Sequence, residues 1–229
     1  MKLAIMQPYF LPYIGYWQMI KAVDKYVIYD DVNFIKGGWM NRNRMLLGGS
    51  EFLFNLQLKG ASPNKLIRDV EVDQNQSKFL KTATQAYTKT PYFDKVMPLL
   101  EKVCRYEKSN LGRFLGNSLI EISKYLGLST EFIYSSDIDK DNRLRAQAKV
   151  LHICKLMGAT EYYNAIGGQE LYSKKDFASA GIELKFLKTL PVEYSQFKNE
   201  FVPWLSILDV LMFNDPQQAN VMLDKYELI

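Results

Sequence analysis

Two adjacent acids, Asp30 and Asp31, follow a short apolar run and could act together in chemistry. Paired carboxylates can bind a metal, a ribose or an ammonium group, and crowding raises the pKa of one of them. They could equally be solvated loop acids that cap neighbouring backbone. Their place directly after an apolar run predicts that they sit at the carboxyl end of a strand, and we treat both as candidate catalytic residues.

The densest cluster of polar and aromatic residues follows at 39–44. Arginine offers a fork for phosphate or carboxylate, asparagine both donates and accepts hydrogen bonds, and tryptophan supplies a face for stacking. A surface loop with incidental charge is the alternative, but the composition favours binding. The candidate substrate-binding residues of this region are Lys36, Trp39, Asn41, Arg42, Asn43 and Arg44.

Glycines mark two further candidate binding segments. Gly15 stands at the entrance to an expected helix, where a missing side chain lets a ligand approach the backbone, although spacing alone favours a turn glycine that packs helix on strand. Asn164 precedes Gly167 and Gly168 after a strand-like run. That segment could wrap a ligand with its backbone amides, or it could be a tight turn.

Other residue types exclude several classes of site. The single histidine, His152, lies in an apolar helical pattern that favours a structural role, so no Ser-His-Asp triad can be argued. Cys104 and Cys154 lack Cys-x-x-Cys spacing, which argues against a disulfide scaffold or a zinc site, and we predict no metal site. The net charge of +4 comes without a basic stripe, so DNA binding is not expected.

A β-α-β unit must position the N-terminal groups. Apolar runs at 2–6 and 26–29 predict strands on either side of a helix at 16–23, and the carboxyl ends of such strands are where open α/β sheets bind ligands. Further along, the pattern predicts a loop at 33–44 and strands at 52–58 and 67–72. It also predicts helices at 78–89, with Ser77 as N-cap, at 109–126, and within 204–213.

The whole pattern predicts one α/β domain over residues 1–229, with a Rossmann-like parallel sheet and a mainly helical segment around 77–126. Composition is that of a globular protein, at 48% hydrophobic and 24% charged residues. The sequence has no apolar run of about 18 residues and only a short apolar start, so we expect a cytoplasmic protein without a membrane span. The oligomeric state cannot be read from the sequence.

Long motifs stand at residues 6–16, 29–32, 39–44 and 205–214. Together with shorter motifs between them they resemble the WbqC-like family, and the resemblance covers nearly the whole chain. Membership implies a cytoplasmic enzyme associated with bacterial surface-polysaccharide or O-antigen gene clusters, and transfer of glycine or a similar acyl group to an amino sugar. Ala165 stands where proline is expected, and the segment at 141–145 departs from the family pattern. The motifs are Met6-Gln-Pro-Tyr-Phe-Leu-Pro-Tyr-Ile-Gly-Tyr16, Tyr29-Asp-Asp-Val, Ile35-Lys36, Trp39-Met-Asn-Arg-Asn-Arg44, Ile166-Gly-Gly168, Leu171-Tyr172 and Leu205-Ser-Ile-Leu-Asp-Val-Leu-Met-Phe-Asn214.

A more distant similarity concerns the start of the first helix. Tyr13-Ile-Gly-Tyr16, after a strand and a loop with proline, resembles the His-x-Gly-His signature of nucleotidyltransferases, pantothenate synthetase and class I aminoacyl-tRNA synthetases. The similarity implies a nucleotidyltransferase-like sheet. Tyr13 and Tyr16 replace both histidines, and because tyrosine is not a cation at pH 7, this difference argues against ATP activation.

These resemblances lead to one main hypothesis, acyl transfer to the amine of a nucleotide-linked amino sugar. Asp30 or Asp31 would orient or deprotonate the amine, and Tyr13 and Tyr16 would donate hydrogen bonds to the developing oxyanion. Lys36, Arg42 and Arg44 would hold the diphosphate, with Trp39 stacking on a ring. Gln7, Tyr9, Gly15, Asn164, Gly167 and Gly168 complete the candidate binding set.

The acyl donor stays open at this point between an adenylate made from ATP, a charged tRNA and a thioester. Two alternative functions also stay open. One is nucleotidyl transfer, with the same cradle binding a nucleoside triphosphate. The other is a non-catalytic binding protein of the polysaccharide machinery.

Overall fold

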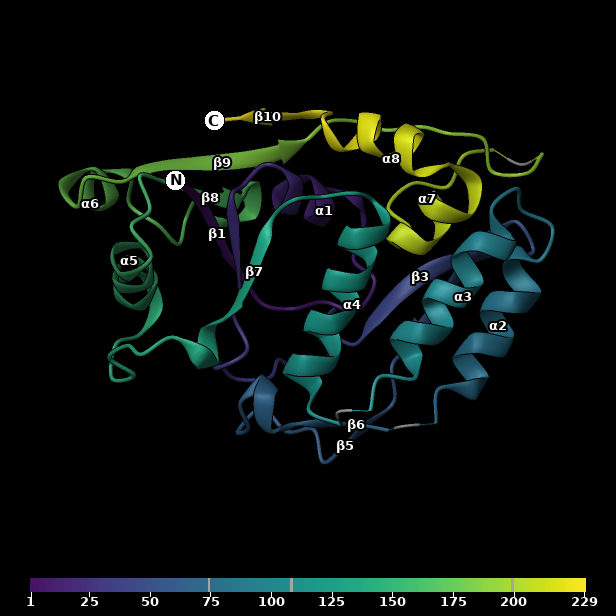
Figure 1. The fold of residues 1–229 in the computed structure, drawn as a ribbon, viewed down its shortest axis with the longest axis horizontal. Helices are drawn as coiled ribbons and strands as arrows, with labels where there is room; N and C mark the ends of the chain where they lie inside the picture. The colour runs from purple at the N-terminus through teal and green to yellow at the C-terminus, as the bar shows by residue number, and fades with distance from the viewer. Residues whose placement is uncertain (74, 108, 199) are drawn as a thin grey trace.

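The computed structural model describes residues 1–73, 75–107, 109–198 and 200–229, and Figure 1 shows its strands and helices. The strands are β1 (Lys2–Met6), β2 (Lys25–Ile28), β3 (Arg42–Leu47), β4 (Ser50–Asn55), β5 (Leu58–Lys59), β6 (Glu71–Val72), β7 (Glu131–Tyr134), β8 (Glu161–Ala165), β9 (Glu183–Thr189) and β10 (Tyr226–Leu228). The helices are α1 (Ile14–Lys21), α2 (Ser77–Tyr87), α3 (Phe93–Cys104), α4 (Leu111–Tyr125), α5 (Ala146–Leu156), α6 (Lys174–Ser179), α7 (Ile207–Phe213) and α8 (Pro216–Leu223). Short 3-10 turns are η1 (Ile67–Asp69), η2 (Ser135–Asp137) and η3 (Ile166–Gly168).

The main sheet has β1 at its centre. Within the described ranges it holds six strands in the order β10-β9-β8-β1-β2-β7. The pairs β1–β2, β1–β8, β2–β7 and β8–β9 are parallel, and β10 alone among these strands runs antiparallel, at the edge beside β9. The chain builds outward from β1 through β2 to β7 and then returns to add β8 and β9 on the other side. This is a doubly wound, Rossmann-like sheet, as the sequence predicted. The order in which the chain adds strands reverses between β1 and β8, although these two strands are parallel.

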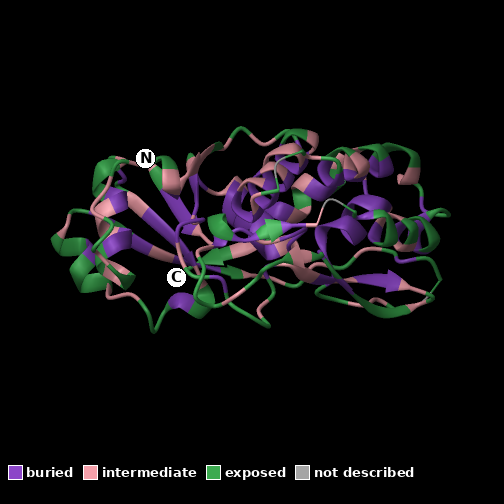
Figure 2. Ribbon diagram, turned by 90° about the horizontal axis from the view of Figure 1, so that it is seen from below, coloured by how far each residue is buried: buried purple, intermediate pink, exposed green. Residues whose placement is uncertain are grey.

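Each face of the sheet packs on its own helices because side chains of a strand alternate between faces. Ala4 of β1 belongs to a large core shared with α1, α4 and α7, whereas Leu3 and Ile5 belong to a second core shared with α5 and α6. Figure 2 shows the strands largely buried between these layers, with the outer loops exposed. The near-continuous apolar run of β1 is therefore typical of a strand buried on both faces.

Much of the segment between β2 and β7 lies at one end of the molecule, although α4 packs on the main sheet. Figure 1 places α2, α3 and β3 there, away from α5 and α6. The predicted helical segment contains α2, α3 and α4, but Ser77 is the first residue of α2 rather than its N-cap, which is Gln76. The Asn75 carboxamide oxygen accepts hydrogen bonds from the Ser77 backbone and hydroxyl, which explains why a serine is suited to this helix start.

Two predicted boundaries in this region were wrong. The segment 67–72 is not one strand: it forms the turn η1 and then the two-residue strand β6. The predicted loop at 33–44 ends in β3, which begins at Arg42 and pairs antiparallel with β4. β3 buries Asn43 and Met45 while Arg44 stays partly exposed. Because of these polar and charged residues, the composition of the segment predicted a loop instead of a strand.

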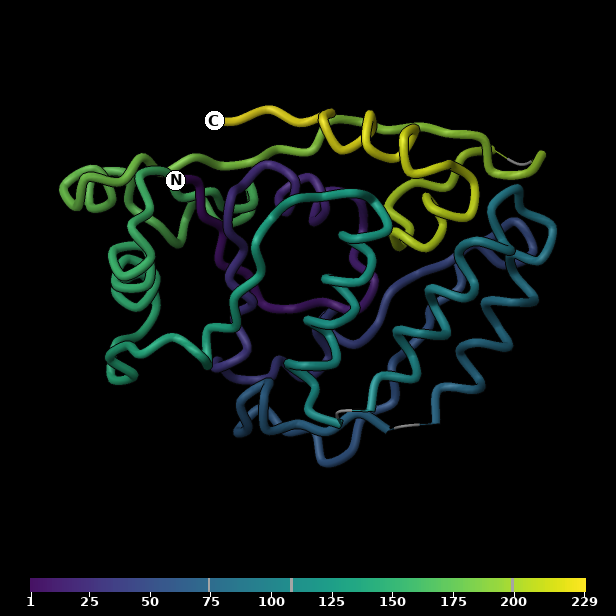
Figure 3. Tube along the Cα trace, viewed as in Figure 1, coloured from purple at the N-terminus to yellow at the C-terminus, as the bar shows by residue number. Residues whose placement is uncertain are grey.

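The C-terminal segment closes one side of the sheet. Figure 3 shows the chain from α8 running back beside β9 to the C-terminus. On α7 the buried Asp209 carboxylate accepts hydrogen bonds from Tyr87 of α2 at 2.8 Å, and from Tyr194 and Gln196 at 2.7 Å each. None of the helices in the described part of the chain combines the length and apolar character that a membrane span requires.

Candidate functional site

A cavity of about 500 Å³ lies at the carboxyl ends of β1 and β8, where the order of strand addition reverses. We call it the first cavity. Its walls come from residues 5–9 at the end of β1, from the start of α1, and from residues 164–166 after β8. Doubly wound sheets bind ligands at this position because the loops diverge there and leave a crevice. The sequence predicted this edge of the sheet as the site.

Uncharged polar groups converge on the first cavity. Gln7, Tyr9 and Tyr13 line it together with Asn164, and within the described ranges the lining contains no charged side chain. The Gln7 amide and the hydroxyls of Tyr9 and Tyr13 make no side-chain hydrogen bond to any described residue. An apolar cavity with a few free polar groups is the usual composition of a small-molecule site.

Tyr9, Tyr13 and Tyr16 of this cavity stay neutral at ordinary pH. Burial raises the pKa of Tyr13, and burial and then the neighbouring Tyr13 raise the pKa of Tyr9, against a smaller lowering by Arg44 and Arg42. Burial also raises the pKa of Tyr16. Each phenol therefore keeps its proton and can act as a hydrogen-bond donor but not as a base.

Tyr16 and Gly15 serve the cavity wall. The Tyr16 hydroxyl donates to the Gln7 carbonyl at 2.7 Å, which uses its single hydrogen. Gly15 lines the cavity, and a Cβ there would meet the Thr189 hydroxyl and lie 2.5 Å from the Tyr13 ring. The missing side chain thus allows Tyr13 and Thr189 to approach the first turn of α1, which agrees with a packing role for this glycine.

Of the polar-aromatic cluster at residues 39–44, Trp39 lines the first cavity, and Arg42 and Arg44 lie next to Trp39. The guanidinium carbons of Arg42 and Arg44 each lie 5.0 Å from the centroid of the Trp39 ring. Arg44 also pairs with Glu51 at 3.0 Å. The two cations lie near enough to Tyr9 to lower its pKa, so the structure places positive charge beside an uncharged cavity.

Other members of the predicted cluster have local partners. Asn41 donates to the Leu56 carbonyl at 3.1 Å, and the buried Asn43 donates to the Leu11 carbonyl at 2.6 Å. Lys36 is exposed and does not line the first cavity. These contacts fix the β3 end against the loop after β1, which holds Trp39 in place.

The glycine segment after β8 forms η3 at the opposite wall. Asn164 donates to the Tyr162 hydroxyl at 3.1 Å and accepts from the Ala165 backbone at 2.7 Å. A Cβ on Gly168 would lie 2.9 Å from the Asn164 oxygen, whereas Gly167 has open space around it. Gly168 therefore lets the turn close over Asn164, and neither of the two glycines lines the first cavity.

Asp30 does not line the first cavity. Its side chain is fully buried, and its two oxygens accept hydrogen bonds from the Ser136 backbone at 2.9 Å and the Ser136 hydroxyl at 2.7 Å. A Cβ on Gly112 of α4 would lie 2.8 Å from the Asp30 Cβ. Asp30 thus joins the ends of β2 and β7 to α4, and a direct role on a substrate amine would require it to leave these partners.

Asp31 lies in a buried cluster with two lysines. One of its oxygens, Oδ2, is 2.9 Å from the Lys140 ammonium and 3.0 Å from that of Lys149, and all three side chains are almost completely buried. Burial raises the pKa of Asp31, but the neighbouring Ser135 hydroxyl and the Lys140 and Lys149 ammonium groups outweigh it and leave the pKa below its usual value. Asp31 is therefore an ionised, ion-paired residue beside the first cavity rather than a free base.

The chain is similar to known proteins over nearly its whole length. The model of the WbqC-like protein family matches residues 7–221, a range that includes every residue lining the first cavity except Ile5 and Met6. The chain belongs to the WbqC-like protein family. It is also 29% identical over 227 residues to "Uncharacterized protein Rv1507c" of Mycobacterium tuberculosis, which covers 95% of each chain. No solved structure matches this WbqC-like protein.

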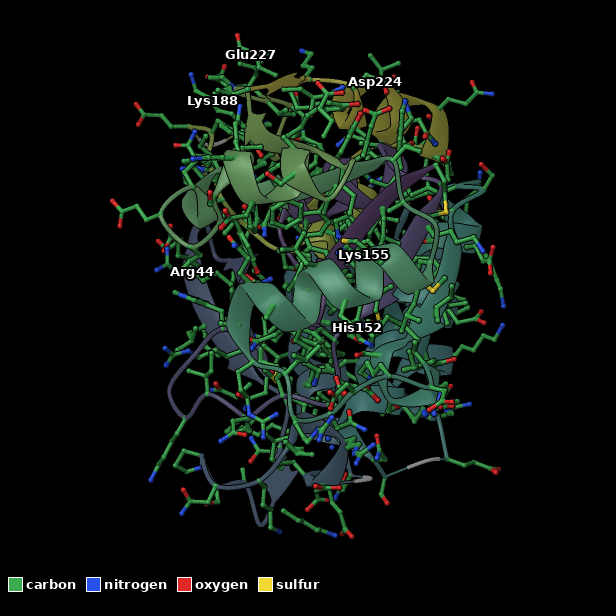
Figure 4. The ribbon with its side chains drawn as sticks, turned by 90° about the vertical axis from the view of Figure 1, so that its left-hand side faces the viewer. Arg44, His152, Lys155, Lys188, Asp224 and Glu227 are labelled. Carbon is green, nitrogen blue, oxygen red and sulfur yellow. The ribbon has the colours of Figure 1, made fainter. Side chains whose placement is uncertain are left out.

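The sequence reading of this WbqC-like chain missed Tyr29 and Lys149. Tyr29 directly follows β2 and lines the first cavity, and the Lys149 ammonium lies 5.2 Å from the centroid of its ring. Lys149 could have been noticed, because it shares the buried stripe of α5 with Val150 and Ile153, where a lysine needs a partner. Figure 4 shows α5 crossing the near face with His152, whose Nε2 accepts a backbone hydrogen bond at 3.2 Å in the expected structural role.

Proposed function

We propose that this WbqC-like protein is a cytoplasmic transferase that places a glycyl or similar acyl group on the amine of a nucleotide-linked amino sugar in bacterial surface-polysaccharide (O-antigen) biosynthesis. The observation that carries the proposal is the first cavity, because it combines the ligand position of a doubly wound sheet with free, uncharged polar groups. Such groups suit the hydroxyls and amide of an amino sugar, which are uncharged donors and acceptors.

In this proposal the sugar lies inside the first cavity and the nucleotide lies over its rim. Gln7 and Tyr9 bind the sugar, since their polar groups have no partner among the described residues. Trp39 offers its ring for stacking, and Arg42 and Arg44 hold the diphosphate by charge-assisted hydrogen bonds. Lys36, exposed in the same loop, adds positive charge near the nucleotide.

The proposed reaction forms a bond from the neutral amine to the acyl carbonyl carbon and breaks the bond from that carbon to the leaving group. The leaving group departs with its electron pair and takes up the proton that the amine nitrogen loses. The negative charge that develops on the carbonyl oxygen needs a donor that keeps its proton, and the raised pKa of Tyr13 provides one. Tyr16 supports the reaction through the Gln7 backbone that it holds. Asp30 and Asp31 fix the end of β2 and with it the position of Tyr29.

The test is a transfer assay with the full-length chain. Nucleotide-linked amino sugars are incubated with glycine plus ATP, with glycyl-tRNA, or with a glycyl thioester, and mass spectrometry follows the gain of one glycyl group. We expect product with one donor, and a strong loss of product in Tyr13→Phe, which removes the donor and keeps the ring. Absence of product with every donor and sugar would overturn the glycyl assignment.

A second candidate function, a non-catalytic binding protein, is favoured by a separate observation. Asp30 and Tyr16, two of the predicted catalytic residues, use their polar groups on internal partners. A protein that only binds would hold a nucleotide-linked amino sugar at a Trp39-dependent site and return it unchanged with all three donors. Calorimetric binding without turnover would therefore select this candidate over the transferase.

A further inference from the structure

A second cavity, of about 410 Å³, lies beside the first. It is bounded by Asp31 and the residues after β2, by Leu66 and Arg68 before and within η1, and by the N-terminal part of α5 with the loop before it. Tyr29 lines both cavities, so the two lie next to each other at this residue. The function proposed above does not use this second cavity.

Positive charge dominates the second cavity. Arg68, Arg145 and Lys149 line it, and Asp31 is the one acidic side chain that the described ranges contribute to its lining. Lys140, buried behind Asp31, already forms an ion pair with that carboxylate at 2.9 Å. Two buried ammonium groups thus share one carboxylate, and the exposed Arg68 and Arg145 add further positive charge to the lining. The uncompensated positive charge of the buried cluster is costly unless an anion accompanies it.

Lys149 has an unused hydrogen-bond donor at the cavity wall. Its ammonium group donates to Asp31 twice, to the carbonyl at 3.3 Å and to Oδ2 at 3.0 Å, which leaves one of its three N–H groups without an acceptor among the described residues. The Lys149 side chain is only 6% exposed. Lys140 differs, because the carbonyls of Ser135 and Ile138 satisfy its remaining donors.

The two arginines also lack strong acidic partners. Arg145 donates to the carbonyls of Asn142 and Leu144, and no carboxylate in the described part of the chain forms an ion pair with it. The Arg68 guanidinium approaches Asp69 only at 4.0 Å. Both planar guanidinium groups can therefore turn to an incoming oxyanion, which they bind in a bidentate way.

We propose that the second cavity binds the phosphate group of a phosphorylated small molecule. Phosphate fits better than a single carboxylate, because it carries more negative charge to balance the net positive charge around the cavity. Its oxygens can also accept hydrogen bonds from three separate cations. Lys149 supplies the buried contact, and Arg68 and Arg145 close on the group from two different segments. This inference stands apart from the proposed acyl transfer, since it concerns the affinity of another cavity for an oxyanion.

The experiment measures binding of inorganic pyrophosphate and inorganic phosphate to the full chain by calorimetry. Arg68→Gln and Arg145→Gln each remove one charged contact at a partly exposed position, so each variant should bind pyrophosphate at least roughly tenfold more weakly. Lys149→Met should weaken binding similarly, because the Asp31–Lys140 pair remains. Arg105→Gln, an exposed arginine at the end of α3, is the matched control and should bind as the original chain does.

Two results would overturn the inference. One is pyrophosphate binding that is unchanged in Arg68→Gln, Arg145→Gln and Lys149→Met, or absent in the original chain. The other is a loss of binding in Arg42→Gln alone, which would place the anion at the rim of the first cavity. Urea unfolding of each variant separates loss of binding from loss of folding, and an activity assay is not needed for either result.

Discussion

Replacing Asp31 by asparagine should destabilise the protein far more than replacing Lys149 by methionine. Asp31→Asn keeps the shape but leaves two buried ammonium groups, 2% and 6% exposed, facing a neutral amide. Removing the shared partner of buried charges costs about 3–5 kcal/mol. Lys149→Met leaves Asp31 paired with Lys140 alone. The lost hydrogen bonds of Lys149 are partly offset because one fewer charge is buried, so we expect this variant to lose less than about 2 kcal/mol of unfolding free energy.

Urea unfolding of the three proteins at pH 7 measures this difference, and pH adds an independent check. The folded-state pKa of Asp31 is lower than its unfolded value of 3.8, so the unfolded chain binds the proton first. The contribution of Asp31 is therefore complete above that value and is lost as the pH falls through the folded pKa. The difference in the free energy of unfolding between the original chain and Asp31→Asn should therefore become smaller in acid. The reasoning is refuted if Asp31→Asn costs less than Lys149→Met, or if this difference becomes larger in acid.

Three further predictions concern the first cavity and the core. Gly15→Ala should cost about 1–3 kcal/mol in urea unfolding and weaken sugar-nucleotide binding, because the new Cβ pushes on Thr189 and the Tyr13 ring. Trp39→Ala, at a residue that is 43% exposed, should change stability by less than about 0.5 kcal/mol yet lower calorimetric affinity for a nucleotide-linked amino sugar. Asp209→Ala should cost at least about 3 kcal/mol in thermal unfolding, since three buried donors lose their acceptor.

The sequence predicted the part of the fold that depends on local pattern. The run at 2–6 is apolar on both faces, and the break at Gln7 and Pro8 marks where β1 ends and the first cavity begins. Because parallel strands end at one edge, the position of the cavity followed from the order of strands and helices. β3 could not be found in this way, because its outward arginines have the composition of a loop.

The pairing of charges could not be predicted, because it joins residues far apart in the chain. Asp31 meets Lys149 across 118 positions, and neither local charge nor spacing identifies that partner. The adjacent acids were expected to act together, yet Asp30 bonds to Ser136 on one side and Asp31 to two lysines on the other. Adjacent residues at a strand end point to opposite faces, so a sequence pair need not form a chemical pair.

The separation of Asp30 from Asp31 also explains how one strand end serves two cavities. Tyr29 lines both the uncharged first cavity and the positively charged second cavity. Burial, followed by the Asp31 charge, raises the pKa of Tyr29, so its phenol ring remains neutral. A ligand in one cavity that moves this ring changes the wall of the other. Binding of pyrophosphate and of a nucleotide-linked amino sugar should therefore be coupled, and Tyr29→Ala should reduce that coupling in paired calorimetric titrations.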